Sequence, residues 1–207
     1  MSVSADGFVG GPNGEIDWLL KTMSDEGAAW TVDKISKAGL HIMGSRTFHD
    51  MAAYWPTSNE PFAAPMNKIP KVVFSRKGVV QPTRADLTTG ALKDATRNAR
   101  EQGWKNVVSP DAATWDNVPV MGKDLVADIQ KLKEQDGGPI LAHGGAGFAQ
   151  SLVATGLIDE YQLLIHPVML GKGLPIFTSL AAPLFLKLES TTRFGSGVIA
   201  NIYRPVR

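Results

Sequence analysis

The residues of this chain best suited to chemistry are small and polar groups that follow short apolar runs. The apolar run 139–142 leads through His143 into a glycine-rich turn made of Gly144, Gly145, Ala146 and Gly147. A helix is expected just beyond, over 149–155, and such a turn exposes backbone N–H groups that can bind a phosphate. The turn matches neither the G-x-G-x-x-G fingerprint nor a P-loop. Taken alone, it is explained equally well as a tight strand-to-helix turn.

A second candidate is the segment Gly44, Ser45, Arg46 and Thr47, which follows the short apolar run 40–43. Hydroxyl groups and backbone N–H groups at a helix start suit a pyrophosphate, and the planar fork of an arginine suits a terminal phosphate. The alternative is an ordinary helix cap followed by a solvated arginine. On its own the segment favours that alternative.

A third candidate is Ser75 with Arg76, which follow the apolar run 71–74. In open α/β sheets ligands bind beyond the carboxyl ends of the strands, so the three candidates are expected to lie at one sheet edge. Arg46 and Arg76 together would suit a 2′-phosphate and favour NADP over NAD. The alternative for Arg76 is a solubilising residue just after a buried strand.

Asp6, in the turn-like segment 4–9, is the candidate catalytic residue. A carboxylate beside Gly7 can orient a substrate or relay a proton. The alternative is an Asx-turn, in which the carboxylate accepts hydrogen bonds from nearby backbone N–H groups.

Trp18 and Trp55 are the candidate substrate contacts, because they flank the expected loops and can stack on a flat ring. The alternative is that both rings pack in the core or at its rim.

Composition excludes several other functions. The formal net charge of +1 gives no field that would recruit nucleic acid or an anionic membrane, and no apolar run approaches the length of a membrane span. The chain has no cysteine, and its four histidines form no metal-binding pattern, so no metal site is expected. The first residues do not resemble a signal peptide, and we expect a cytoplasmic protein.

The pattern of apolar runs predicts a single α/β domain over residues 1–207, with a mostly parallel sheet and an antiparallel C-terminal edge. Helices are expected over 17–20, 25–38, 47–54, 89–102, 123–135 and 149–155. Residues 3–9 are expected to be the end of a strand that runs into a loop. Further strands are expected over 40–43, 71–75, 106–108, 118–121, 139–142, 160–166, 184–193 and 198–203.

Several motifs occur together in an order that resembles the dihydrofolate reductase-like family, which includes the reductase domain of bacterial riboflavin biosynthesis. The resemblance covers roughly residues 2–76 and 115–204. It is carried by the segments 4–7, 17–19, 43–48, 54–56, 71–76, 144–147, 157–161 and 167–173.

This resemblance implies a central, mostly parallel sheet of about eight strands that binds NADPH across its carboxyl edge. Gly44, Arg46 and Thr47 would contact the phosphates, and Ser75 with Arg76 would contact the adenosine 2′-phosphate. The four residues Gly144, Gly145, Ala146 and Gly147 would lie against the pyrophosphate and the nicotinamide. In such folds the paired glycines are often joined by a cis peptide bond. A homodimer is expected as well.

Three departures from the family pattern stand out. The chain starts close to the Ser4–Gly7 motif, so a short first strand is expected. Residues 77–114 read as an insertion before Trp115. The carboxylate by which dihydrofolate reductases protonate a pterin from their first helix has no counterpart at matching spacing, although Asp25 and Glu26 lie nearby.

The sequence thus predicts an NADPH-dependent reductase that transfers hydride to a small heterocyclic or carbonyl or imine substrate. One alternative is a riboflavin-pathway reductase acting on a ribosylamino-pyrimidine phosphate. Another is a non-catalytic nucleotide-binding protein on the same fold, because a fold does not secure a function.

Overall fold

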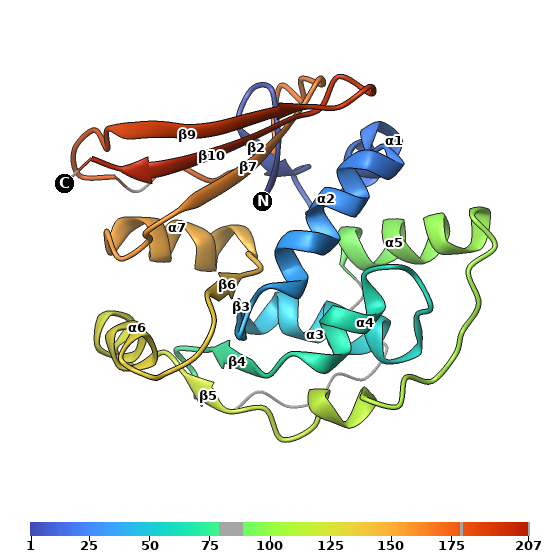
Figure 1. The fold of residues 1–207 in the computed structure, drawn as a ribbon, viewed down its shortest axis with the longest axis horizontal. Coiled ribbons are helices and arrows are strands. Elements are labelled where there is room, and N and C mark those ends of the chain that lie inside the picture. Colours follow the sequence, from blue (N-terminus) through green and yellow to red (C-terminus); the bar gives the residue numbers. More distant parts are fainter. Residues whose placement is uncertain (79–88, 179, 207) are drawn as a thin grey trace.

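One of the two larger sheets of the computed structural model, which describes residues 1–78, 89–178 and 180–206, is a four-stranded parallel sheet (Figure 1). Its strands lie in the order β5 (Val120–Met121), β4 (Lys71–Phe74), β3 (Leu40–Gly44) and β6 (Ile140–Ala142). Every neighbouring pair in it is parallel. All four residues of β4 are buried, as expected for a parallel strand covered on both faces.

The strands of a second four-stranded sheet lie in the order β1 (Ser2–Ser4), β7 (Tyr161–His166), β10 (Ile199–Pro205) and β9 (Leu186–Arg193). β1 runs parallel to β7, whereas β10 is antiparallel to both β7 and β9. The expected antiparallel C-terminal edge is therefore confirmed, and β1 has three residues. A further antiparallel pair joins β2 (Phe8–Gly10) to β8 (Leu174–Pro175).

The expectation of one sheet of about eight strands is wrong, because eight strands divide equally between the two larger sheets. Among the described strands, β1 pairs only with β7. Helix α7 (Ala146–Ala154) packs against both sheets (Figure 1). Its Leu152 packs with Ile42 of β3, and its Val153 packs with Leu163 of β7. The helix thus occupies the space between the two sheets.

The remaining α-helices begin and end close to the expected positions, with a further short one at α4. Side-chain caps define three of their starts: Ser24 accepts from Gly27 N–H, Thr89 from Leu92 N–H and Asp124 from Ala127 N–H. The helices are α1 (Asp17–Thr22), α2 (Asp25–Ser36), α3 (Ser45–Tyr54), α4 (Ala63–Lys68), α5 (Gly90–Glu101) and α6 (Leu125–Lys133), with 3₁₀ turns η1 (Trp55–Thr57) and η2 (Ala112–Trp115).

The strand expected over 106–108 is wrong. Asn106 makes only an isolated bridge with Ser58, and Val107 N–H donates to the Thr57 carbonyl at 2.8 Å. The segment lies alongside the turn η1 and joins no sheet, and Val108 is 74% exposed. Residues 79–88 of the expected insertion lie outside the described residues.

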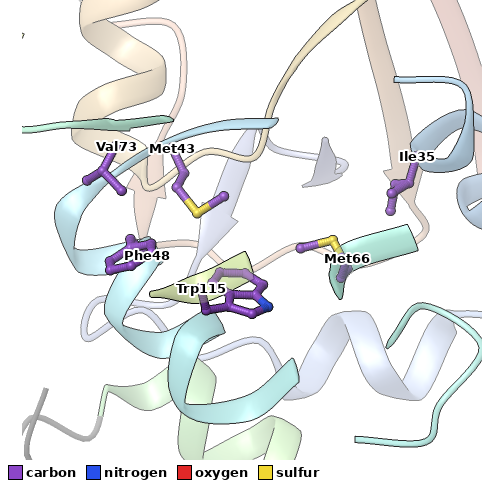
Figure 2. Packing of buried hydrophobic residues seen from close by; sticks show 6 residues of the cluster. All are labelled: Ile35, Met43, Phe48, Met66, Val73 and Trp115. Atoms are coloured by element: carbon purple, nitrogen blue, oxygen red, sulfur yellow. The ribbon is translucent and has the colours of Figure 1, made fainter. Parts of the chain in front are cut away.

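Alternating side chains of the parallel sheet point to opposite faces and pack in two separate hydrophobic clusters. Met43 and Val73 face a cluster that also contains Ile35, Phe48, Met66 and Trp115 (Figure 2). Ile42, Val72 and Phe74 face the opposite cluster, with residues of α6 and α7. This two-residue period places a helix layer on each face and leaves the carboxyl edge of the sheet as the place for a ligand.

Candidate functional site

The three candidate segments lie at the same carboxyl edge of the parallel sheet. Gly44 is in register with Phe74, so Ser75 follows β4 beside the end of β3. Gly44 N–H also points to the Gly144 carbonyl at 3.5 Å, which brings the end of β3 next to the turn after β6. The convergence predicted from the sequence is therefore present in the fold.

The turn after β6 requires glycine at two consecutive positions. Gly144 and Gly145 have φ angles of 77° and 71°, in the left-handed region that glycine adopts readily. A Cβ atom on Gly145 would lie 2.6 Å from Thr47 Oγ1, and one on Gly144 would lie 2.7 Å from the methyl group of Met1. The expected cis bond is absent, since all peptide bonds of the described residues are trans; paired positive φ angles make the turn instead.

The N-termini of α3 and α7 lie side by side at this turn. Gly44 is the N-cap of α3 and Gly145 that of α7, and neither helix start has a side-chain cap hydrogen bond. The close approach of Gly145 to Thr47 joins the two helix starts. Two helix N-termini with small residues around them form a site that favours an anion.

Ser75 and Arg76 lie one strand further along the same edge. Ser75 N–H donates to the Met121 carbonyl at 2.7 Å, and Arg76 is exposed. Gly122, which follows β5, has a φ of 112° and would place a Cβ 3.0 Å from Ser75 N. Gly122 was not predicted from the sequence, although it follows a strand and precedes a helix as Gly44 and Gly144 do.

Asp6 lies in the turn between β1 and β2, where its carboxylate links that turn to the loop after β7. It accepts hydrogen bonds from Ser4 Oγ at 2.6 Å and from the backbone N–H groups of Leu170 and Gly171. The hydrogen bond from Ser4, followed by those from the two backbone groups, lowers the pKa of Asp6 although partial burial opposes the shift. The carboxylate therefore binds backbone donors, but donors distant in sequence and not those of a local Asx-turn.

The two candidate tryptophans pack against protein groups. Trp18 is only 6% exposed, donates from Nε1 to the Glu15 carbonyl at 3.2 Å and meets the ring of His166 edge-on. Trp55 is half-buried and contacts the rings of Tyr54 and Phe62. These positions correspond to the core and rim packing that the sequence analysis gave as the alternative.

His166, at the carboxyl end of β7, was not selected from the sequence. It is fully buried beside Ser4, and its Nδ1 lies 2.7 Å from Thr22 Oγ1. Its Nε2 is buried and has no hydrogen-bond partner within the described part of the chain. Burial lowers the pKa of His166 to about 4, so the ring is neutral at neutral pH. Only its inward place in the alternation of 161–166 could have drawn attention to it.

The fold defines an α/β protein with a phosphate-compatible sheet edge, and comparison with known proteins assigns it to a family. The sequence model of the RibD C-terminal domain matches residues 1–200, and the chain belongs to that family. The family is related to riboflavin-pathway reductases and to dihydrofolate reductase, as the resemblance implied.

Individual relatives agree with this assignment. The chain is 28% identical to the uncharacterized protein YyaP of Bacillus subtilis over 204 residues, which cover 98% of this chain and 91% of that one. It is similar in fold to a putative riboflavin biosynthesis protein from Shewanella sp. PV-4, with a TM-score of 0.67, 19% identity and coverage of 100% and 97%. It is also similar to a dihydrofolate reductase from Enterococcus faecalis complexed with NADP(H), with a TM-score of 0.56, 13% identity and coverage of 100% and 94%. The dihydrofolate reductase-like α/β fold is thereby confirmed.

Within the described residues, no helix has the length and apolar character that a membrane crossing needs.

Proposed function

We propose that this protein is an NADPH-dependent reductase acting on a small heterocyclic or carbonyl or imine substrate. The observation that carries the proposal is the pair of helix N-termini at Gly44 and Gly145, which lie together at the carboxyl edge of the parallel sheet. Anionic ligands favour such an edge, and added side chains at the glycines would fill it. Membership of a reductase-like family supports the same conclusion.

The residues at this edge fit a phosphorylated dinucleotide. The α3 start, with Gly44, Ser45, Arg46 and Thr47, would bind phosphate oxygens through N–H, hydroxyl and guanidinium groups. Ser75 and Arg76 would bind the 2′-phosphate, and the turn Gly144–Gly145–Ala146–Gly147 would lie against the pyrophosphate and nicotinamide. When bound, NADPH supplies the hydride, and the protein supplies position and electrostatics.

Asp6 would act in this scheme as a positioning residue. Its carboxylate holds the backbone of Leu170 and Gly171 against the turn after β1, so it fixes the shape of the loop after β7. Trp18 and Trp55 could stack on a substrate ring only if they moved away from the protein side chains that they now contact.

Titration with NADPH and NADH, followed by tryptophan fluorescence, tests the cofactor. NADPH is expected to bind at least about tenfold more tightly than NADH, because charge-assisted bonds to the 2′-phosphate are worth about 1.5–3 kcal/mol each. Arg46→Ala and Arg76→Ala should each weaken NADPH binding much more than NADH binding, because both guanidinium groups suit the 2′-phosphate. Arg193→Ala, an exposed arginine on the edge strand β9, is the matched control. Equal binding of both dinucleotides by the wild type would refute the proposed role of the arginines.

A riboflavin-pathway reductase acting on a ribosylamino-pyrimidine phosphate is the second candidate, and the family assignment favours it. NADPH oxidation followed by absorbance, with this compound and with dihydrofolate as acceptors, separates the two reductase hypotheses. If the protein binds NADPH but oxidises it with neither acceptor, the result favours the non-catalytic nucleotide-binding alternative. The homodimer and the cytoplasmic location expected from the sequence stay predictions.

A further inference from the structure

Asp50 is a carboxyl group that the candidate cofactor edge does not use. It lies on α3, three residues after Thr47, which places the two side chains on adjacent parts of one helix face about 4.5 Å apart along the axis. Phe48, Met51 and Ala52 of the same helix face the core, so Asp50 lies beside the buried stripe. The helix therefore carries Asp50 one turn beyond the contact between Thr47 and the glycine turn.

The N-terminus of α5 and the loop before α1 close around the same position. Thr89 Oγ1 donates to Asp50 Oδ2 at 2.7 Å. A Cβ atom on Gly90 would lie 2.9 Å from Glu15 N and 3.0 Å from the Asn13 carbonyl, so α5 begins directly against that loop. Asp50 is thus enclosed by α3, the start of α5 and, next to that start, the loop before α1.

The second oxygen of this carboxyl group has no partner. Asp50 Oδ1 is buried, and no group of the described residues forms a hydrogen bond with it. A buried polar atom without a partner costs about 1–3 kcal/mol, so it marks a place where a ligand or water completes the bonding. Burial raises the pKa of Asp50, against the smaller opposing effects of the Thr89 hydroxyl and of the charges of His49 and Arg46.

Reduction of a C=N or C=O group needs a proton as well as a hydride, and a protonated carboxyl group in a partly buried place is a suitable donor. Asp6 does not suit this step, because its carboxylate already accepts three groups and its pKa is lowered. Trp18 has no acidic proton to give, and the pKa of His166 is lowered to about 4, so its ring is neutral at neutral pH and is a poor acid.

We propose that Asp50 contacts the substrate and donates the proton that completes its reduction, with Oδ1 as the donating atom. This inference rests on the proposed reductase function. The substrate carbon accepts hydride from the reduced nicotinamide, which is oxidised, while the adjacent nitrogen or oxygen forms a bond to the proton as the Oδ1–H bond breaks. The carboxylate then regains its proton from water.

The first test does not depend on turnover. In protein labelled with ¹³C at the aspartate carboxyl carbons, the resonance lost in Asp50→Asn identifies Asp50, and its pH titration gives the pKa. The titration is expected above the ordinary aspartate range, and Thr89→Val should move it higher, because the lost hydroxyl bond stabilises the ionised form. Titration at or below the ordinary range would overturn the proposal.

The second test uses NADPH with dihydrofolate or the ribosylamino-pyrimidine phosphate as the probe. An acid must be protonated to act, so the wild-type rate should fall as pH rises through the pKa of Asp50. Asp50→Asn should lower the rate about 100-fold or more and remove that limb, with NADPH affinity unchanged within about twofold. Asp33→Asn, an exposed carboxylate paired with Lys37, is the matched control and should leave rate and profile unchanged.

The outcomes separate the two proposals. Failure of the wild type to bind NADPH would overturn the reductase function and this inference together. Normal NADPH binding with an undiminished rate and unchanged pH profile in Asp50→Asn would overturn the role of Asp50 alone.

Discussion

At the scale of single residues, Gly145 meets two constraints at once. Its φ of 71° lies in the left-handed region, and Thr47 Oγ1 occupies the space that a Cβ atom would need. Gly147, two residues on, lies inside α7 with no atom within 4 Å of a Cβ position. A side chain is therefore excluded at Gly145 by backbone conformation and by Thr47, whereas Gly147 has room for one.

Gly145→Ala is expected to lower the free energy of unfolding by about 1–3 kcal/mol, through backbone strain and the clash with Thr47. It should also weaken NADPH binding, because the turn must shift away from α3. Gly147→Ala should be neutral or raise stability by up to about 1 kcal/mol, since alanine is the better helix former. Urea unfolding of both variants measures the difference, and equal losses would contradict the steric argument.

The candidate residues differ in how far the sequence could define them. The glycines and Arg46 follow recognisable strand ends, so their place was predictable. The partners of Asp6 are 164 and 165 residues away, and no local pattern could reveal that its carboxylate binds Leu170 and Gly171. Asp50 belongs to no motif, and only the docking of α5 gives it a distinctive environment.

At the scale of elements, α5 supports the loop that precedes α1. Asp94 of α5 is buried and accepts hydrogen bonds from the backbone N–H groups of Ile16 at 2.8 Å and Asp17 at 3.1 Å. It also forms an ion pair with Arg97 of its own helix. One carboxylate therefore joins part of the expected insertion to the start of the first helix.

Asp94→Ala should lower the free energy of unfolding by about 2 kcal/mol, because it leaves two backbone donors without their acceptor. Amide hydrogen exchange at residues 16 and 17 should accelerate more than exchange in β3. Asp33→Ala, which removes an exposed ion pair with Lys37, should cost no more than about 0.5 kcal/mol. Unchanged exchange at residues 16 and 17 would show that α5 does not hold the loop.

Most elements were predictable because their signals are local. Capping residues and apolar spacing identify helices such as α2 and α6. The division into two sheets was not predictable, because it depends on α7 packing between them. The strand predicted over 106–108 was wrong for a related reason. The valines of this segment favour a strand, but its backbone forms hydrogen bonds with residues near η1.

At the scale of the whole molecule, three histidines make stability depend on pH: His41 and His166 are buried, and His143 is half-buried with a buried Nε2 atom. His41 is fully buried, and its ring lies edge-on to His143 with the centroids 4.3 Å apart. Burial, followed by the charge of Lys71, lowers the pKa of His41 to about 4, and burial lowers that of His166 to the same value. The pKa of His143 is lowered too, chiefly by burial.

The contribution of these histidines to stability should therefore be full above about pH 7.5 and should be lost as pH decreases from about 6.5 to 4. Over that range the unfolded chain binds protons that the folded protein excludes, and each unit of pKa difference is worth about 1.4 kcal/mol. His41→Leu should flatten the dependence without loss at neutral pH, because both ring nitrogens of His41 lack partners among the described residues. His49→Gln is the control. Urea unfolding at several pH values tests this, and a pH-independent midpoint for the wild type would contradict it.

The strand order also sets when each part of the protein can form during synthesis. The parallel sheet is complete once Ala142 has left the ribosome, since β6 is its last strand. The other sheet waits for β10, and its first strand must find β7 across about 160 residues. The cofactor edge can thus assemble before the second sheet is complete, whereas the region around Asp6 closes only after β7 and residues 170–171 have been synthesised.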